Sequence, residues 1–213
     1  MKPILLCTLT ILNTAHALNK MNLPFNIPTS TTQLIVVTKY TGVMVDVAAL
    51  QKNSTGKWQQ ILPTIKANCG SQGIAAPNQK KEGDNKTPSG LYKLGPAYGT
   101  HPLALKMDYR YITNQDKFID DPDSSDYNTW VEGDTTAQTY EIMNQENGAY
   151  DLGVVINYNM NPIVPGRGSA IFMHIWQGPN IGTQGCIAMD RQDMLHILKW
   201  LNKNANPYIL IVS

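Results

Sequence analysis

The chain has 213 residues, of which 15% are charged and 42% are hydrophobic, and its formal net charge is +1. Soluble domains usually carry about a quarter charged residues, so this chain is poor in charge. The near balance of acidic and basic residues leaves no basic footprint for nucleic acid, and the apolar content excludes a disordered tail. The length indicates one domain or two small ones.

The first 17 residues have the features of a secretory signal peptide. Lys2 precedes a short apolar run at residues 4–12, and Ala15 and Ala17 stand at the two positions that signal peptidase reads. The run is far too short to cross a bilayer, which takes about 20 apolar residues. A buried N-terminal helix is the alternative interpretation.

Cleavage after residue 17 has consequences for the rest of the chain. We expect an N-terminal extension at residues 18–31, a functional domain at residues 32–213, and no stable membrane insertion of the mature chain. It would carry equal numbers of basic and acidic residues and only two cysteines, Cys69 and Cys186. An even cysteine pair in an exported protein invites a disulfide. The expected location is the periplasm or cell envelope.

Most of the remaining sequence indicates β-structure. Apolar and β-branched segments predict strands at residues 33–38, 43–50, 58–62, 154–156, 170–176 and 208–212. Residues 71–90 form a long polar stretch that ends in a predicted turn, and residues 98–138 are expected to be rich in loops. The best helix is at residues 190–202, where Asp190 can cap an apolar stripe. The expected fold is mostly β, a sandwich or barrel with a C-terminal helix and long loops.

Cys186 and His174 are the candidate catalytic pair. Cys186 ends the turn Gly182-Thr183-Gln184-Gly185-Cys186, just before the predicted helix, and His174 lies on a strand 12 residues earlier. A thiol attacks only as the thiolate, and a nearby imidazole that takes the proton is the usual activator. Backbone N–H groups at Gly185 and Cys186 can stabilise an oxyanion. By itself, one Cys and one His is a weak signal, and a core histidine with a structural cysteine explains it as well.

The order of motifs strengthens this interpretation, because His174 followed by Thr183-Gln184-Gly185-Cys186-Ile187 resembles the catalytic signature of the YkuD-type L,D-transpeptidase domain. Further segments resemble an exported bacterial branch of this family, and the likeness runs from about Gln33 to Val212. These segments are Gly73-Ile74-Ala75, Glu82-Gly83-Asp84, Thr87-Pro88-Ser89-Gly90, Asp120-Asp121-Pro122, Tyr127-Asn128, Tyr158-Asn159 and Gly168-Ser169-Ala170-Ile171-Phe172.

The resemblance implies a cysteine acyltransferase that acts on peptidoglycan stem peptides. Cys186 would be the nucleophile and His174 the general base, with the amides of Gly185 and Cys186 in the oxyanion hole. The thiolate attacks the L-to-D bond after the third stem residue, D-alanine leaves, and an amine resolves the acyl-enzyme. The family uses no metal and no organic cofactor, and we expect a monomer.

Other residues are candidates for positioning or binding. Thr183 and Gln184 belong to the turn before Cys186, and Gln184 replaces the histidine that many family members carry. Ala188 likewise replaces a common arginine, so the acyl acceptor, amine or water, is open. The candidate substrate-binding residues are Arg167, whose guanidinium suits a carboxylate, Tyr127, Asn128, and Trp176 on the strand face of His174.

Two alternatives to acyl transfer follow from the same residues, and a calcium loop is a separate candidate. Water in place of the amine would make the protein an L,D-carboxypeptidase. A disulfide between Cys69 and Cys186 would make it a catalytically silent wall-binding module. The segment 121–132 has oxygen ligands at calcium-loop spacing, but Asp126 replaces the required glycine and no helices flank it, which favours a simple Asp/Ser turn.

Overall fold

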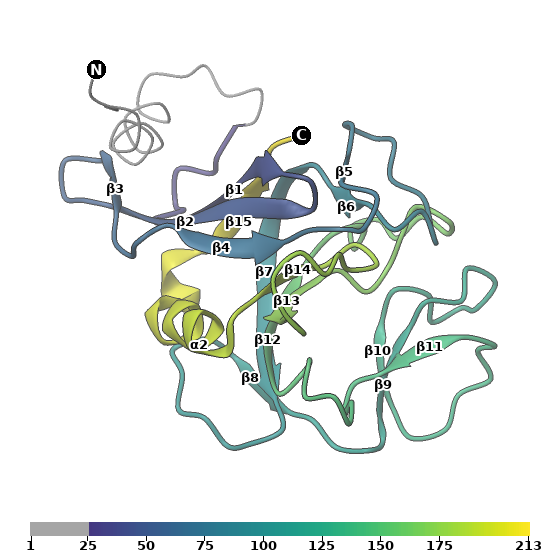
Figure 1. Cartoon of the computed structure of the whole chain (residues 1–213). Coiled ribbons are helices and arrows are strands. Elements are labelled where there is room, and N and C mark those ends of the chain that lie inside the picture. The colour runs from purple at the N-terminus through teal and green to yellow at the C-terminus, as the bar shows by residue number, and fades with distance from the viewer. Residues whose placement is uncertain (1–25) are drawn as a thin grey trace.

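The computed structural model describes residues 26–213, so the predicted signal peptide lies outside the described residues. Figure 1 shows the strands wrapping around a core, with the single helix of the described region beside them. The elements are β1 (Gln33–Thr41), β2 (Met44–Lys52), β3 (Trp58–Gln60), β4 (Ile65–Asn68), β5 (Ile74–Ala75), β6 (Thr87–Pro88), β7 (Gly90–Gly99), β8 (Tyr109–Tyr111), β9 (Asp116–Ile119), β10 (Trp130–Glu132), β11 (Tyr140–Ile142), β12 (Leu152–Ile156), β13 (Phe172–Ile175), β14 (Ile187–Met189), α2 (Arg191–Trp200), a 3-10 turn (Lys203–Ala205) and β15 (Tyr208–Ile211).

The main sheet closes on itself. Its strands follow the order β1-β15-β7-β12-β13-β14-β4-β2, and a further antiparallel pairing of β1 with β2 joins the two ends. Closure removes exposed sheet edges, which otherwise invite pairing with other chains. The mostly β, barrel-like fold with a C-terminal helix is therefore confirmed.

The interior of the barrel is filled by aliphatic side chains from every strand of the closed sheet and by the apolar stripe of α2. Asp190 caps the helix, since its carboxylate accepts the N–H of Gln192 at 2.8 Å. Met194, Ile197 and Leu198 are fully buried, and burial of each such side chain contributes about 1.5–3 kcal/mol. The predicted helix thus packs where its stripe requires.

A second, smaller lobe packs on the outside of the barrel. It contains the three-stranded sheet β10-β9-β11, seen apart from the barrel in Figure 1. Edge-to-face aromatic contacts join the lobes. The distance between ring centres is 5.0 Å for Phe118 and Phe172, and 5.5 Å for Tyr98 and Trp130. Residues 98–138 are rich in loops, as expected, and the short strands β8, β9 and β10 interrupt them. The predicted turn at residues 87–90 is wrong, because Thr87–Pro88 pairs with β5 and β7 starts at Gly90.

Strand β13 lies between the two lobes, and its successive side chains point alternately into the barrel core and toward the small lobe. Met173 and Ile175 point into the barrel core, whereas Phe172 belongs to the aromatic cluster outside it. His174 shares the outer face, where its ring contacts the edge of Tyr150 at 5.1 Å. A period of two therefore delivers the imidazole to the space between barrel and small lobe.

Candidate active site

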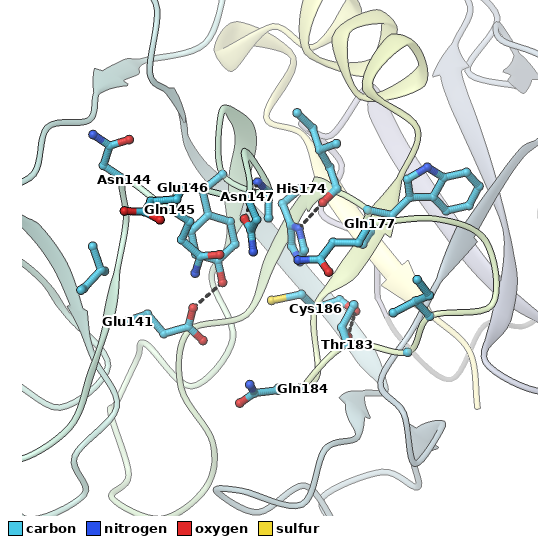
Figure 2. A pocket seen from close by; sticks show the side chains of 18 of the residues that line it. Glu141, Asn144, Gln145, Glu146, Asn147, His174, Gln177, Thr183, Gln184 and Cys186 are labelled. Atoms are coloured by element: carbon cyan, nitrogen blue, oxygen red, sulfur yellow. Dashed lines mark hydrogen bonds between the residues drawn. The ribbon is translucent and has the colours of Figure 1, made fainter.

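Cys186 and His174 line one pocket of about 920 Å³ between the barrel and the small lobe. The chain brings them together through sheet register: β13 and β14 are parallel neighbours, His174 is paired with Ala188, and Cys186 comes directly before β14. Figure 2 shows the thiol and the imidazole projecting into the same pocket, with Glu141 on the side that the sulfur faces. The two residues singled out in the sequence thus share a cavity.

The Cys186 thiol is held by the backbone of the strand that carries the histidine. Its Sγ accepts the N–H of Phe172 at 3.3 Å, and its S–H donates to the carbonyl of Ala170 at 3.3 Å. Burial raises the pKa of this thiol far above its ordinary value, and the negative charge of Glu141 raises it further. The Phe172 N–H and the Lys80 cation act in the opposite direction. In the resting structure the sulfur is therefore a protonated thiol.

The His174 ring is oriented by a backbone carbonyl. Its Nδ1 lies 2.8 Å from the carbonyl oxygen of Ile175, and because a carbonyl can only accept, Nδ1 carries the hydrogen. Nε2 is then the ring nitrogen with a free lone pair. Burial lowers the pKa of His174 to about 4, against the opposing effect of the backbone hydrogen bonds. A neutral imidazole with an accepting Nε2 is the form that a general base needs.

The turn before Cys186 is fixed by a threonine hydroxyl and a glycine. The Thr183 hydroxyl donates to the carbonyl of Cys186 at 2.7 Å and accepts the N–H of Gly185 at 3.1 Å. Gly185 has φ +146°, and a Cβ there would lie 3.0 Å from both Ile171 Cδ1 and the Lys86 carbonyl oxygen. Only glycine fits this position. The Gly185 N–H must break its hydrogen bond to the Thr183 hydroxyl before it can donate to an oxyanion.

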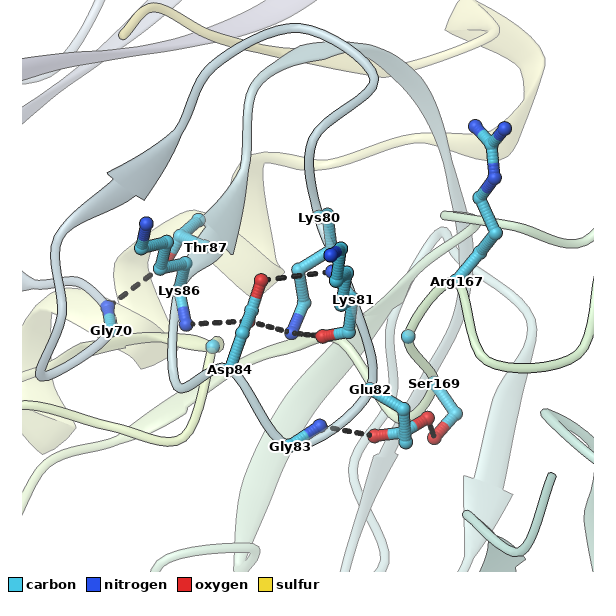
Figure 3. A network of polar contacts seen from close by, with 12 residues as sticks. Gly70, Lys80, Lys81, Glu82, Gly83, Asp84, Lys86, Thr87, Arg167 and Ser169 are labelled. Carbon is cyan, nitrogen blue, oxygen red and sulfur yellow. Dashed lines mark hydrogen bonds and ion pairs between the residues drawn. The ribbon is translucent and has the colours of Figure 1, made fainter.

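The buried side of the same turn rests on the loop that contains residues 71–90. Lys80 is 5% exposed, its Nζ bonds Asp84 at 2.6 Å and the Lys81 carbonyl at 2.9 Å, and it would lie 3.7 Å from a Cβ at Gly185. Figure 3 shows this Lys80–Asp84 network. The loop therefore supports the turn from behind, and none of its residues lines the pocket with Cys186.

A second part of the network ties the loop to the strand before His174. The Glu82 carboxylate accepts the Ser169 hydroxyl at 2.7 Å and the hydroxyl of Tyr127. The N–H of Gly168 donates to the same tyrosine oxygen at 3.0 Å. These bonds, partly visible in Figure 3, fix the segment whose Ala170 carbonyl accepts the Cys186 S–H.

Tyr127 and Asn128 are placed away from the pocket that holds Cys186. Both are 2% exposed, and the Asn128 amide donates to the carbonyls of Tyr158 and Asn159 while its oxygen accepts the N–H of Ala170. Their contacts hold the segment before β13 in place. Their predicted substrate-binding role stays a prediction.

The other sequence candidates divide between two cavities. Thr183, Gln184 and Trp176 line the pocket with Cys186, and Gln184 is exposed there. Arg167 instead lines a separate small pocket of about 180 Å³, together with Ser89. The structure thus does not bring Arg167 to the thiol.

Sequence reasoning missed two residues of the pocket, the acidic Glu141 and the phenolic Tyr150. Glu141, on β11, accepts the hydroxyl of Tyr150, and both line the pocket with His174. Burial raises the pKa of Glu141, and the Asp120 charge adds to this rise. No spacing signal links residue 141 to residue 186, because only the folded small lobe places them together.

The alternatives based on a disulfide or calcium find no support in the geometry. Cys69 and Cys186 are both free and buried, so the pairing required by the silent module is absent from the structure. In the segment 121–132, the Asp121 carboxylate is occupied by the N–H groups of Asp123 and Gln138. Among residues 26–213, no group of three potential metal ligands occurs and no helix is long and apolar enough to span a membrane.

Cys186 and His174 line one pocket on the outside of a closed barrel, and together they present the two groups that thiol-based acyl transfer uses. The family model of the YkuD L,D-transpeptidase catalytic domain matches residues 33–209, and the chain belongs to this family. The match covers most of the chain, which includes Cys186 and His174. No curated protein matches the sequence significantly.

Proposed function

We propose that the protein is a peptidoglycan-modifying cysteine acyltransferase of the cell envelope. The observation that carries the proposal is the pocket that Cys186 and His174 share. In this pocket the imidazole is neutral, and its Nδ1–H donates to the Ile175 carbonyl, so Nε2 is available to accept a proton. The family match supports a stem-peptide substrate outside the cytoplasm.

Acylation starts from a neutral thiol and a neutral imidazole. Because burial disfavours both charged forms, proton transfer from Sγ to His174 Nε2 accompanies the attack of sulfur on the L-to-D peptide carbonyl. The oxyanion forms beside the amides of Gly185 and Cys186. The protonated His174 then gives its proton to the departing D-alanine amine, and a thioester to Cys186 remains.

Transfer repeats these steps with a second nucleophile. An amine attacks the thioester carbonyl, His174 Nε2 takes the amine proton, and the sulfur leaves and recovers a proton from the imidazolium. Atoms balance, since one peptide bond is broken and one is made. If water attacks instead of the amine, the product is a shortened stem and the enzyme is an L,D-carboxypeptidase.

The test is incubation with purified muropeptides, followed by mass spectrometry. Cross-linked dimers or amine adducts with loss of D-alanine support transfer, and tripeptide stems alone support hydrolysis. Cys186→Ala should abolish both, whereas Cys69→Ala serves as the matched control. Full turnover by Cys186→Ala would show that the nucleophile is assigned wrongly.

A further inference from the structure

The ionisable side chains that line the pocket around Cys186, apart from the cysteine, histidine and tyrosines, are all acidic. Its ionisable carboxylates are Asp120, Glu141 and Glu146, and within the described part of the chain no lysine or arginine lines it. Lys80 lies behind the Gly185 turn and is paired with Asp84. Lys117 lies over the ring of the pocket residue Tyr140, 5.5 Å from its centre, and donates to the Gly133 carbonyl at 2.5 Å. A ligand in this pocket therefore meets negative charge.

Glu141 is the carboxylate that is best fixed for binding. It lies in β11, which pairs with β9, and one of its oxygens accepts the Tyr150 hydroxyl. The Tyr150 ring packs edge-to-face on His174 at 5.1 Å between ring centres. Glu141 is thus held by the same tyrosine that borders the imidazole.

Asp120, the residue after β9, provides an independent observation. Its Oδ1 is enclosed and has no hydrogen-bond partner among the described residues. An enclosed carboxylate oxygen without a partner is costly, and Asp120 lines the pocket, so a donor that reaches this oxygen from the pocket gains a strong, charge-assisted bond. Glu141 lines the same pocket, and the negative charge of Asp120 contributes to the raised pKa of Glu141.

We propose that Glu141 and Asp120 form a subsite for a primary ammonium group of the substrate. This proposal rests on the proposed function, because a diamino acid in a stem peptide carries such a group. The ammonium can come from the side chain of the stem that acylates Cys186, or from the amine that later accepts the acyl group. A carboxylate at this place would be repelled.

Binding of the ammonium also affects the nucleophile. The Glu141 charge opposes formation of a thiolate at Cys186 and raises the pKa of the thiol. An ammonium paired with Glu141 cancels most of this opposition. The correct substrate therefore activates the thiol that attacks it, while a neutral or anionic ligand leaves the thiol at rest.

The first experiment tests the subsite without turnover. The probe is Nα-acetyl-lysine methylamide, its neutral control is the Nε-acetylated form, and binding is followed by amide chemical shifts of the isotope-labelled protein. We expect shifts at Glu141, Asp120 and Tyr150 for the ammonium probe alone, and about tenfold weaker binding in Glu141→Gln and Asp120→Asn. Glu132→Gln, an exposed carboxylate outside the pocket, should bind as wild type. Equal binding of both probes, or unchanged affinity in Glu141→Gln, overturns the subsite.

The second experiment identifies the source of the ammonium. A stem tetrapeptide with a free side-chain amine is compared with its amine-acetylated form in single-turnover acylation of Cys186. The preformed acyl-enzyme is then mixed with an amine acceptor. If the donor stem carries the bound group, acetylation slows the first step about tenfold and Glu141→Gln removes the difference. If the acceptor carries it, Glu141→Gln slows only the second step.

The two proposals fail in distinguishable ways. Absence of acylation by any stem, with probe binding intact, contradicts the proposed function and leaves the ammonium subsite standing. Normal acylation and transfer, with no dependence of either step on Glu141 or Asp120, contradicts the subsite and leaves the acyltransferase standing. Glu141→Gln keeps the size of the side chain and an oxygen for Tyr150, so it is a conservative test of charge.

Discussion

The part of the chain that the structure describes contains two buried thiols, Cys69 and Cys186, in opposite surroundings. Cys69 is 1% exposed, belongs to the aliphatic core of the barrel, and its S–H donates to the carbonyl of Gly70 at 3.7 Å. Cys186 is 6% exposed and shares a pocket with the His174 imidazole, and a carboxylate and a cation act on its pKa. The pKa of both thiols is raised by burial. Burial alone therefore does not make a cysteine inert or reactive; the neighbours that can exchange its proton do.

The largest expected difference between the two regions is in covalent labelling. A carbapenem, which acylates the cysteine of this family, should add to Cys186 and leave Cys69 unmodified, because Cys69 is buried among aliphatic side chains and lines neither pocket described above. Peptide mapping by mass spectrometry locates the adduct. Cys186→Ala should lose the adduct entirely and Cys69→Ala should keep it. An adduct at Cys69 alone would reverse the assignment.

The histidine makes the Cys186 region sensitive to pH in a way that the Cys69 region is not. His174 titrates near 6.5 when unfolded and at about 4 when folded. Between these values the unfolded chain binds the proton and the folded chain does not, so the free energy of unfolding decreases as the pH falls from 6.5. The stability that depends on neutral His174 is present in full above pH 6.5. Below about pH 4 the free energy of unfolding has fallen by about 3 kcal/mol from this cause and falls no further.

Urea unfolding of wild type and His174→Gln at pH 7.5 and 4.5 measures this contribution. The wild type should lose more stability than His174→Gln over this interval, since other groups titrate equally in both. Identical losses would mean that the imidazole is not buried in its neutral form.

Gly185→Ala is expected to distort the Cys186 turn and leave the Cys69 region folded. The new Cβ would meet Lys86 O and Ile171 Cδ1 at 3.0 Å, at a φ that alanine rarely adopts. Displacement of the thiol by about 1 Å costs on the order of 100-fold in rate. Acylation of Cys186 by a stem peptide in a Cys69→Ala background reports this rate, and circular dichroism reports the fold. A wild-type acylation rate would show that the turn is not strained.

Local patterns in the sequence were sufficient for the strands that begin and end the barrel and for α2. They failed for β7, a central strand, because it contains Gly95, Pro96 and Gly99, which normally weaken a strand. The structure explains the glycines: a Cβ at Gly99 would lie 2.3 Å from the Asp151 carbonyl oxygen. Close approach of a neighbouring chain segment leaves no periodic trace in the sequence.

The candidate site, like the fold, was predictable from the sequence only in part. The spacing and turn chemistry around His174 and Cys186 pointed to the pair, because both lie on adjacent segments of one sheet. Glu141 and Lys80 could not be found, since the small lobe brings one to the pocket and the polar loop brings the other behind the turn. Motif residues such as Asn128 are real features of the fold, yet their contacts are with backbone carbonyls and not with the pocket.

Lys80 and Glu141 allow the charge around Cys186 to be changed in both directions. Lys80→Met removes a buried cation that favours the thiolate, so alkylation of Cys186 at pH 8 should slow about tenfold, whereas Glu141→Gln should accelerate it. Lys80→Arg keeps the charge and should restore most of the rate. The pH profile of alkylation by iodoacetamide measures both effects. Slowing by Lys80→Arg equal to that by Lys80→Met would assign Lys80 a purely structural role.

The smallest effect is expected at Cys69 itself. Cys69→Ala removes one buried sulfur from a well-packed core and should lower the free energy of unfolding by about 1–2 kcal/mol. Its backbone carbonyl, which accepts the N–H of Thr183 at 3.0 Å, is unaffected by this change. The Cys186 alkylation rate should therefore stay within about twofold of wild type. A larger fall would mean that packing around Cys69 positions the Thr183 turn, and that the two thiol regions act as one unit.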